Sequence, residues 1–370
     1  MPFNILTPAS TADASTSFQI ETLKRFIKLA RPVVPAKTTI PVLEQIRIYT
    51  EKGKGFLLAT DLECFIRMEI NGLGKGTIDT SVSFKALDAM LSKIGSGTIL
   101  IEQNKDMVSF KVGNKVHFEM KGFNGKDYPI LKPFAKVMDK ATWTTKDMVF
   151  VNQYVAPIAS KDASRIDLGG VMVSIDGDNC DFMSTDRHIL ICTDYAHEKQ
   201  YNVPKILFNV LSAIEFVQPL NAEFSETGVK VSCGSATITC AYIKTPFPAL
   251  VNNLIPKHFK YQYKFNVVKL RDHLTKMVNL STVAKDASVP VAVNLKKDTF
   301  FVDMMNVNCT SAETDDNELW VKIDARRWLT ILERFNDVTE ISAGFNTQDS
   351  PTLWWDSHAK TLLMPMLFNR

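Results

Sequence analysis

Three short stretches of the sequence contain residue types that could support catalysis. Asp61 and Glu63 are separated by one residue, Leu62, so on a strand both carboxylates would face the same side and could bind a metal ion. His188 stands near Asp186 and could act as a general base. Residues 72–77 (GLGKGT) partly match a phosphate-binding loop, but not the full G-x-x-x-x-G-K-[ST] pattern.

None of these stretches has the companions that catalysis needs. No further His, Asp or Glu cluster accompanies the carboxylate pair at a recognisable spacing, and no G-x-S-x-G nucleophile motif is present. We therefore expect that the protein is not an enzyme and that it binds neither a cofactor nor a metal ion. We interpret Asp61 as a turn residue and residues 72–77 as a turn between strands.

Lysine and arginine recur on the faces of three predicted helices, which span residues 20–31, 267–280 and 324–335. Such faces can hold a phosphate backbone through multiple contacts without reading the bases. The alternative is that they are solvated faces with a few helical ion pairs. Recurrence on three helices favours binding to nucleic acid.

The helices belong to a longer repeat. The segments 83–94, 203–214 and 324–335 have apolar residues at helical spacing. Their last apolar residues are Ile94, Ile214 and Phe335, at intervals of 120 and 121 residues. A second predicted helix precedes each of these, at 20–31, 146–160 and 267–280. The sequence thus predicts three copies of one unit.

Strand-like runs lie between the two helices of each copy. Thr60-Asp61 and Thr185-Asp186, 125 residues apart, suit the tight turn of a hairpin, whereas the third counterpart (299–312) lacks such a pair. Alternating runs such as 108–120 favour antiparallel sheets. We expect an α+β fold of three similar domains, each with two helices packed on antiparallel sheets. Their predicted ranges are 1–137 (with a flexible leader, 1–17), 138–258 and 259–370.

Composition narrows the class of protein. The 370 residues include 43 Lys or Arg and 40 Asp or Glu, so the net charge is only +3 and any nucleic-acid binding must come from local patches. The sequence contains no run of about 18 apolar residues, so we predict no membrane span. The N-terminus does not resemble a secretory signal. The six cysteines are scattered, so we expect reduced thiols and a cytoplasmic protein.

Five short motifs occur in an order that resembles the β subunit of bacterial DNA polymerase III, the sliding clamp, over about residues 20–370. They are TTIPVL at 38–43, ATDLE at 59–63, STDRHIL at 184–190, FPALVNNLIP at 247–256 and LLMPML at 362–367. The resemblance implies that two chains join head to tail as a homodimeric ring around double-stranded DNA. It implies a non-catalytic processivity factor in DNA replication, whose further partners are a replicative polymerase and a clamp loader.

The resemblance also implies site residues. A hydrophobic pocket between the second and third domains would take a short peptide ending in apolar residues. The matching positions are Leu168, Thr185, Arg187, His188, Ile189, Leu190, Phe247, Pro248, Leu362, Leu363, Met364, Pro365 and Met366. We expect DNA contacts from Lys24, Lys28, Lys37, Lys161, Arg165, Arg271 and Lys276. Ring closure would use Phe118 and Met120 on an edge strand, facing Leu280 of the partner.

The chain departs from the family at the pocket. The family usually has Gly at the position of Arg187 and Arg at the position of Ile189, and the tail here extends through Arg370. We therefore interpret the chain as a divergent member with its own preference for partner peptides. An alternative is a clamp-fold decoy that binds replication proteins without encircling DNA. The retained basic helix faces argue against it.

Overall fold

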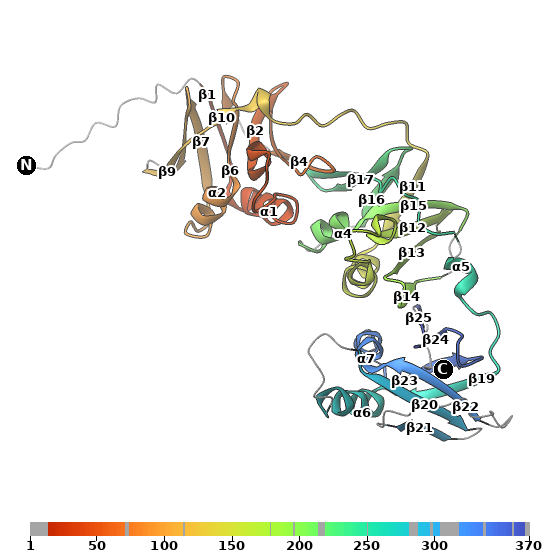
Figure 1. The fold of residues 1–370 in the computed structure, drawn as a ribbon. Helices are drawn as coiled ribbons and strands as arrows, with labels where there is room; N and C mark the ends of the chain where they lie inside the picture. The colour runs from red at the N-terminus through yellow and green to blue at the C-terminus, as the bar shows by residue number, and fades with distance from the viewer. Residues whose placement is uncertain are drawn as a thin grey trace, which may run out of the picture. The chain divides into compact units, whose positions relative to one another are not determined.

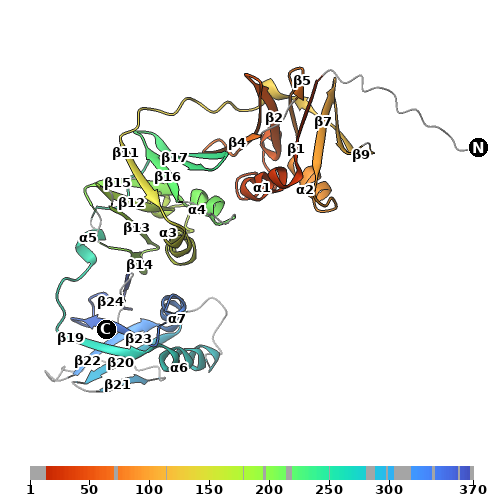
Figure 2. The same cartoon turned by 180° about the vertical axis from the view of Figure 1, so that it is seen from behind.

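The computed structural model describes residues 14–366 except 71–73, 114, 178, 195–196, 214–218, 250, 281–287, 297–298, 304–317, 336–337 and 357–358. Its chain divides into two compact units, Met1–Val149 with Val203–Tyr242, and Phe150–Asn202 with Ile243–Arg370. Figures 1 and 2 show the ribbon from opposite sides.

The first unit contains two antiparallel sheets. One has the strand order β5-β1-β7-β8-β9, and the other has the order β10-β6-β2-β3-β4-β18-β17-β16-β11. The strands of the smaller sheet are β1 (Ala14–Gln19), β5 (Gly74–Lys75), β7 (Thr98–Asn104), β8 (Met107–Val112) and β9 (Lys115–Lys121). Those of the larger sheet are β2 (Gln45–Glu51), β3 (Lys54–Thr60), β4 (Cys64–Ile70), β6 (Asp79–Ser83), β10 (Phe123–Asn124), β11 (Asp139–Trp143), β16 (Leu220–Phe224), β17 (Gly228–Cys233) and β18 (Ala236–Ala241).

The second unit also contains two antiparallel sheets, with the orders β15-β12-β13-β14-β25-β24-β23-β19 and β21-β20-β22. The strands of the larger sheet are β12 (Gly170–Asp176), β13 (Asn179–Thr185), β14 (Ile189–Cys192), β15 (Lys199–Pro204), β19 (Tyr261–Asn266), β23 (Glu340–Phe345), β24 (Thr352–Trp355) and β25 (Lys360–Leu363). Those of the smaller sheet are β20 (Pro290–Lys296), β21 (Thr299–Asp303) and β22 (Glu318–Asp324).

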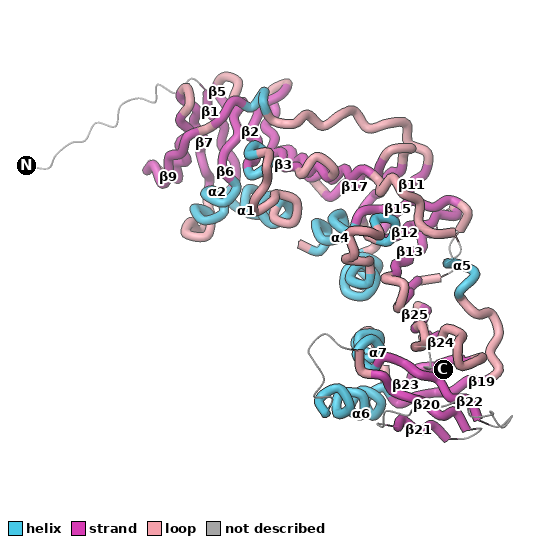
Figure 3. Tube along the Cα trace, in the orientation of Figure 1, coloured by secondary structure: helices cyan, strands magenta, loops and turns pink. Residues whose placement is uncertain are grey.

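The helices pack beside these sheets, as the secondary-structure colouring of Figure 3 makes clear. They are α1 (Ile20–Ala30), α2 (Phe84–Leu91), α3 (Thr145–Phe150), α4 (Lys205–Ser212), α5 (Val251–Leu254), α6 (Val267–Leu280) and α7 (Ala325–Glu333). In both views α6 and α7 lie side by side against the strands of their unit. Mixed helices and antiparallel sheets confirm the predicted α+β class. No helix of the described residues is long and apolar enough to cross a bilayer.

Helical apolar spacing explains why the chain folds locally in this way. On α1 the side chains of Ile20, Leu23 and Ile27 recur every three or four residues and are buried. Side-chain oxygens cap the N-termini of α2 and α7, which each follow a strand directly. The Ser83 side chain accepts a hydrogen bond from the Ala86 N–H of α2, and Asp324 accepts one from the Arg326 N–H of α7.

The repeat predicted from the sequence recurs in the element order. The first helices α1, α3 and α6 begin at residues 20, 145 and 267, at intervals of 125 and 122 residues. The second helices α2, α4 and α7 begin at 84, 205 and 325, at intervals of 121 and 120. We use "first", "second" and "third repeat" for these three copies. The domain boundaries at residues 137 and 258 stay predictions.

One predicted helix is wrong in detail. The sequence indicated a single helix over 146–160, but α3 ends at Phe150 and continues as a π-helical turn (Val151–Val155) and a 3-10 turn (Ala156–Ile158). Pro157 lacks an N–H and cannot continue an α-helix. The Ser184 hydroxyl also donates to the Val155 carbonyl, which holds the irregular turn against β13.

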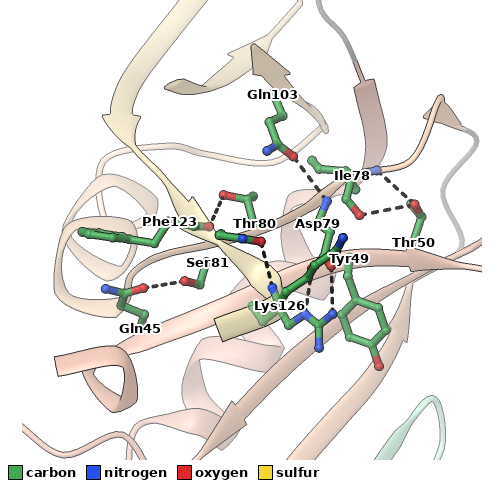
Figure 4. A network of polar contacts seen from close by, with 12 residues as sticks. Gln45, Tyr49, Thr50, Ile78, Asp79, Thr80, Ser81, Gln103, Phe123 and Lys126 are labelled. Carbon is green, nitrogen blue, oxygen red and sulfur yellow. Dashed lines mark hydrogen bonds and ion pairs between the residues drawn. The ribbon is translucent and has the colours of Figure 1, made fainter. Parts of the chain in front are cut away.

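A polar network ties the strands of the first repeat together (Figure 4). Arg47 on β2 donates from Nε and Nη2 to the two carboxylate oxygens of Asp79 on β6, at 2.7 and 2.9 Å. The same carboxylate packs against Gly125, where a Cβ atom would lie 1.8 Å from Asp79 Oδ1. Only glycine therefore fits at this position without moving the ion pair.

Candidate functional site

Two equivalent turns carry the Thr-Asp pairs singled out in the sequence. Between β13 and β14, Asp186 Oδ1 accepts the N–H groups of His188 and Ile189 at 2.9 and 2.8 Å. Thr185 Oγ1 accepts the Arg187 N–H at 3.1 Å and donates to the Ile189 carbonyl at 2.7 Å. These side chains thereby order the backbone of three consecutive residues, 187–189.

The turn between β3 and β4 repeats this pattern. Asp61 Oδ1 accepts the N–H groups of Glu63 and Cys64 at 3.0 and 2.7 Å, and Thr60 Oγ1 accepts the Leu62 N–H at 2.8 Å. These bonds confirm that Asp61 is a turn residue. Among the described residues no three His, Cys, Asp or Glu side chains are arranged to hold a metal ion. Residues 72–77 had been interpreted as a turn between strands, but Gly74 and Lys75 form the short strand β5, and residues 72 and 73 lie outside the described residues.

The β13–β14 turn stands at the rim of a cavity of about 200 Å³ within the second unit. Its lining residues are Arg165, Leu168, Thr185, Arg187, Ile189, Leu190, Pro248, Leu254, Leu362 and Met364. β14 pairs with β25 there, with Leu190 opposite Leu362. Aliphatic and thioether side chains dominate the lining, so the cavity suits an apolar side chain of a ligand.

Eight of the thirteen predicted pocket residues line this cavity. The others are placed differently. Phe247 is buried below it, in one apolar cluster with Leu168 and Leu362. Leu363 points to the opposite face of the sheet, because neighbouring residues of a strand alternate, and packs in the core around Trp328. His188, Pro365 and Met366 are not among the lining residues.

The described tail is nevertheless fixed beside the cavity by its backbone. The Met364 N–H donates to the His188 carbonyl at 2.8 Å, and the Met366 N–H donates to the Lys322 carbonyl at 2.7 Å. Two lining residues escaped the sequence prediction for the pocket. Leu254 lies in the 247–256 motif and could have been included on that ground, whereas Arg165 had been expected to bind DNA.

Charged pairs surround the cavity rim. Arg165 donates to both carboxylate oxygens of Asp167 at 3.0 and 2.7 Å, and these hydrogen bonds lower the pKa of Asp167 below its ordinary value. Arg187 Nη2 lies 3.1 Å from Asp162 Oδ2. Hydrogen bonds from Ser164 and, more weakly, the charge of Arg187 lower the pKa of Asp162.

Arg187 adopts a backbone conformation that glycine normally occupies, with φ of +81°. A residue with a Cβ atom in the left-handed region costs about 1–2 kcal/mol. Leu62 in the equivalent turn has φ of +83°. The turn geometry itself thus demands this conformation, and only the chemistry of the side chain distinguishes the two sites.

Two of the predicted DNA-binding residues are engaged with helix ends. Lys24 Nζ donates to the carbonyls of Ile94 and Gly95 at 2.6 and 2.9 Å, just beyond α2. Arg271 Nη2 donates to the Leu332 carbonyl in α7 at 2.8 Å. Each is the fifth residue of its helix, and each satisfies carbonyls at the end of the neighbouring helix. Both therefore have a structural role that the basic pattern alone did not reveal.

The other predicted cations differ in their surroundings. Lys276 forms an exposed ion pair with Asp272 one helical turn away, at 2.6 Å, and Arg165 belongs to the cavity rim. Lys28 in the last turn of α1, together with Lys37 and Lys161, is exposed. Positive charge open to solvent thus remains at Lys28, Lys37 and Lys161.

The predicted ring-closing residues lie on an open edge. In the described part of the chain β9 is the last strand of its sheet. Phe118 and Met120 stand opposite the buried residues Phe110 and Val108 of β8, so they continue the core face of the sheet. Phe118 is 36% exposed. The side chain of Leu280, at the end of α6, lies outside the described residues.

Two strand pairings that join consecutive repeats, which we call seams, show how a sheet edge of this kind is covered elsewhere in the chain. β4 of the first repeat pairs with β18 of the second, and β14 of the second pairs with β25 of the third. β18 and β25 are the last strands of their repeats, and in the first repeat only the two-residue strand β10 follows β9. Residues 304–317 of the third repeat lie outside the described residues.

Comparisons with known proteins agree on one fold. Residues 16–132 match the family model of the DNA polymerase III beta subunit, N-terminal domain. The chain is similar to the crystal structure of the DNA polymerase III beta subunit from Thermotoga maritima, with a TM-score of 0.80, 16% identity, and coverage of 96% of this chain and 100% of that one. A comparison with curated protein sequences finds no match.

Two further solved structures extend this likeness. The sliding clamp from Caulobacter crescentus gives a TM-score of 0.81 at 18% identity, covering 95% of this chain and 99% of that one. The sliding clamp from Bartonella birtlesii bound to griselimycin gives 0.80 at 18% identity with the same coverage. The domain match and the shared fold confirm the resemblance predicted from the sequence.

Proposed function

We propose that this chain, whose fold is that of the DNA polymerase III β sliding clamps, is a DNA polymerase processivity factor that closes as a head-to-tail dimer around duplex DNA. In this proposal it acts by encircling DNA and by binding partner proteins, and it catalyses no reaction of its own. We infer a cytoplasmic protein whose partners are double-stranded DNA, a replicative polymerase and a clamp loader.

The open edge of β9 carries this proposal. Its counterparts β18 and β25 each pair with an outer strand of the preceding repeat. Among the described residues no strand covers the outer side of β9, and in our proposal the third repeat of another copy supplies the equivalent strand. Pairing there would cover the exposed Phe118 and remove a sheet edge that would otherwise invite aggregation. Two such contacts close a ring of six repeats.

DNA would pass through this ring without being read. The exposed cations Lys28, Lys37 and Lys161 are candidates for phosphate contact, while Lys24 and Arg271 support the helices that carry such residues. Non-specific phosphate contacts are shallow and register-free, which suits sliding. The three predicted domains (1–137, 138–258 and 259–370) are the modules of this ring in our proposal.

The cavity rimmed by the β13–β14 turn is the proposed site for partner peptides. Its apolar lining fits the last side chains of a short peptide, and Met364 can adapt to different ones. Arg187 and Arg165 stand at its rim, but each is paired with an aspartate, so we expect the apolar side chains of the peptide to decide binding.

Retention on DNA of different topology tests the function. The protein is loaded on nicked circular DNA, free protein is removed by gel filtration, and the DNA is then linearised. A clamp is retained on the circle and lost from the linear molecule. Equal retention on both forms would contradict encirclement. A protein that binds the polymerase but is never retained on circles would be the decoy considered from the sequence.

A further inference from the structure

Cys64 and Cys240 face each other across the seam between β4 and β18. The register places them directly opposite, and Cys240 Sγ lies 2.7 Å from Cys64 Sγ. Both side chains are fully buried. They lie 176 residues apart in the sequence, so neither spacing nor motif indicates that they meet.

The strand geometry at this pair suits a covalent link. The Ala241 N–H donates to the Glu63 carbonyl and the Glu69 N–H to the Ser235 carbonyl, both at 2.9 Å. The hydrogen-bonded positions of this strand pair are therefore the odd-numbered ones. Cys64 and Cys240 occupy a non-hydrogen-bonded position, where Cα atoms lie about 4.5 Å apart and side chains are closest. That separation falls at the short end of the range of about 4.4–6.8 Å found in disulfides.

The surroundings keep the pair reduced in the closed sheet. Burial raises the pKa of the Cys64 thiol well above its ordinary value, and contact with Cys240 and the charge of Asp61 raise it further. Little thiolate is therefore present to react. The pair is close to solvent nonetheless, because Cys64 is the first residue of β4 and follows the exposed Leu62 and Glu63, while Cys240 is followed by the exposed Ala241.

We propose that Cys64 and Cys240 are a redox-modification site, at which a low-molecular-weight disulfide converts the seam between the first and second repeats into a covalent joint. Fraying of the strand ends exposes one thiol. Its thiolate attacks the oxidant and releases one small thiol, forming a mixed disulfide. The second thiolate then attacks the protein sulfur and releases the other small thiol. Two protein thiols and one small disulfide thus become one protein disulfide and two small thiols.

The other cysteines provide internal controls. Cys192 is equally buried, and burial raises its pKa to about 12, but its sulfur contacts the Lys360 carbonyl at 3.7 Å instead of a thiol. Cys233 accepts a hydrogen bond from Arg25 Nη2 at 3.4 Å. A reaction governed by burial or reactivity alone would not select the Cys64–Cys240 pair.

The test treats the folded, full-length protein with oxidised glutathione at mildly alkaline pH. The count of titratable thiols, measured with a maleimide after denaturation, should fall from six to four. Non-reducing digestion should yield one cross-linked pair of peptides containing Cys64 and Cys240, and dithiothreitol should reverse the change. The C192A variant should behave like the parent protein, whereas C64A and C240A should each prevent the cross-link.

The melting temperature supplies a second measurement. Oxidation should raise it in the parent and in C192A, and should leave it unchanged in C64A and C240A. Retention of all six thiols, a cross-link between other cysteines, or a cross-link that forms only in denatured protein would overturn the proposal. None of these readouts depends on DNA or partner binding, so the proposal can fail independently of the proposed function.

Discussion

The two Thr-Asp turns offer a matched pair of substitutions, Asp186→Ala and Asp61→Ala. Each aspartate accepts two backbone N–H groups through one oxygen, at 2.7 to 3.0 Å. Hydrogen bonds to a charged group contribute about 1.5–3 kcal/mol each when buried. Both turns are partly exposed, so water will replace part of this, and we expect each variant to lose about 2 kcal/mol of unfolding free energy.

The two variants should differ in peptide binding. The β13–β14 turn supplies Thr185, Arg187, Ile189 and Leu190 to the cavity, whereas the β3–β4 turn supplies none of its lining residues. Asp186→Ala should therefore weaken binding about tenfold or more, equal to at least about 1.4 kcal/mol, and Asp61→Ala should leave binding within about twofold.

Urea unfolding would measure the stability of both variants, and fluorescence polarisation would measure affinity for a labelled peptide ending in Leu-Phe. Equal loss of affinity in both variants would show a global effect. Unchanged affinity in Asp186→Ala would refute the assignment of the turn to the pocket.

Three further predictions separate structural from functional groups. Lys28→Glu should lower retention on circular DNA and reduce the salt dependence of binding. Lys24→Met should chiefly lower stability, by about 1 kcal/mol, because the Lys24 ammonium satisfies helix-end carbonyls. A loss of retention in Lys24→Met and a loss of stability in Lys28→Glu would reverse these two roles. Phe118→Glu should yield monomers in sedimentation equilibrium, and a persistent dimer mass would reject the β9 interface. Burial, followed by the charge of Arg327, lowers the pKa of His188, so its protonation opposes folding. Stability should fall as the pH drops from about 6.5, the ordinary pKa of histidine, and His188→Gln should flatten this decline; an unaltered profile would assign it to other groups.

Local patterns in the sequence predicted much of the fold. The amphipathic spacing of α1, α2 and α7 reports directly on the buried face of a helix, and Thr-Asp pairs favour turns through their own side-chain bonds. The same patterns could not reveal contacts between distant segments. The Lys24 and Arg271 side chains look like solvent-facing cations until the ends of α2 and α7 are placed beside them.

The pocket likewise combines features that local patterns predict with contacts between distant segments that they do not. Alternation along β25 could have separated Leu362 from Leu363, but the pairing that brings Leu362 beside Leu190 joins residues far apart in the chain. Pro157 explains why the α-helix cannot continue, but the hydrogen bond to Val155 comes from Ser184 on β13, 29 residues away in the chain. The Cys64–Cys240 contact likewise requires the register of a seam between two repeats.

Threading on linear DNA tests encirclement most directly, since a closed ring can enter only over a free end. The protein is incubated with long biotinylated duplex whose ends are blocked by streptavidin either before or after mixing, and bound protein is measured after a high-salt wash. A ring is retained only when the ends are blocked after mixing. Equal amounts retained in both orders, or none in either, would contradict the ring.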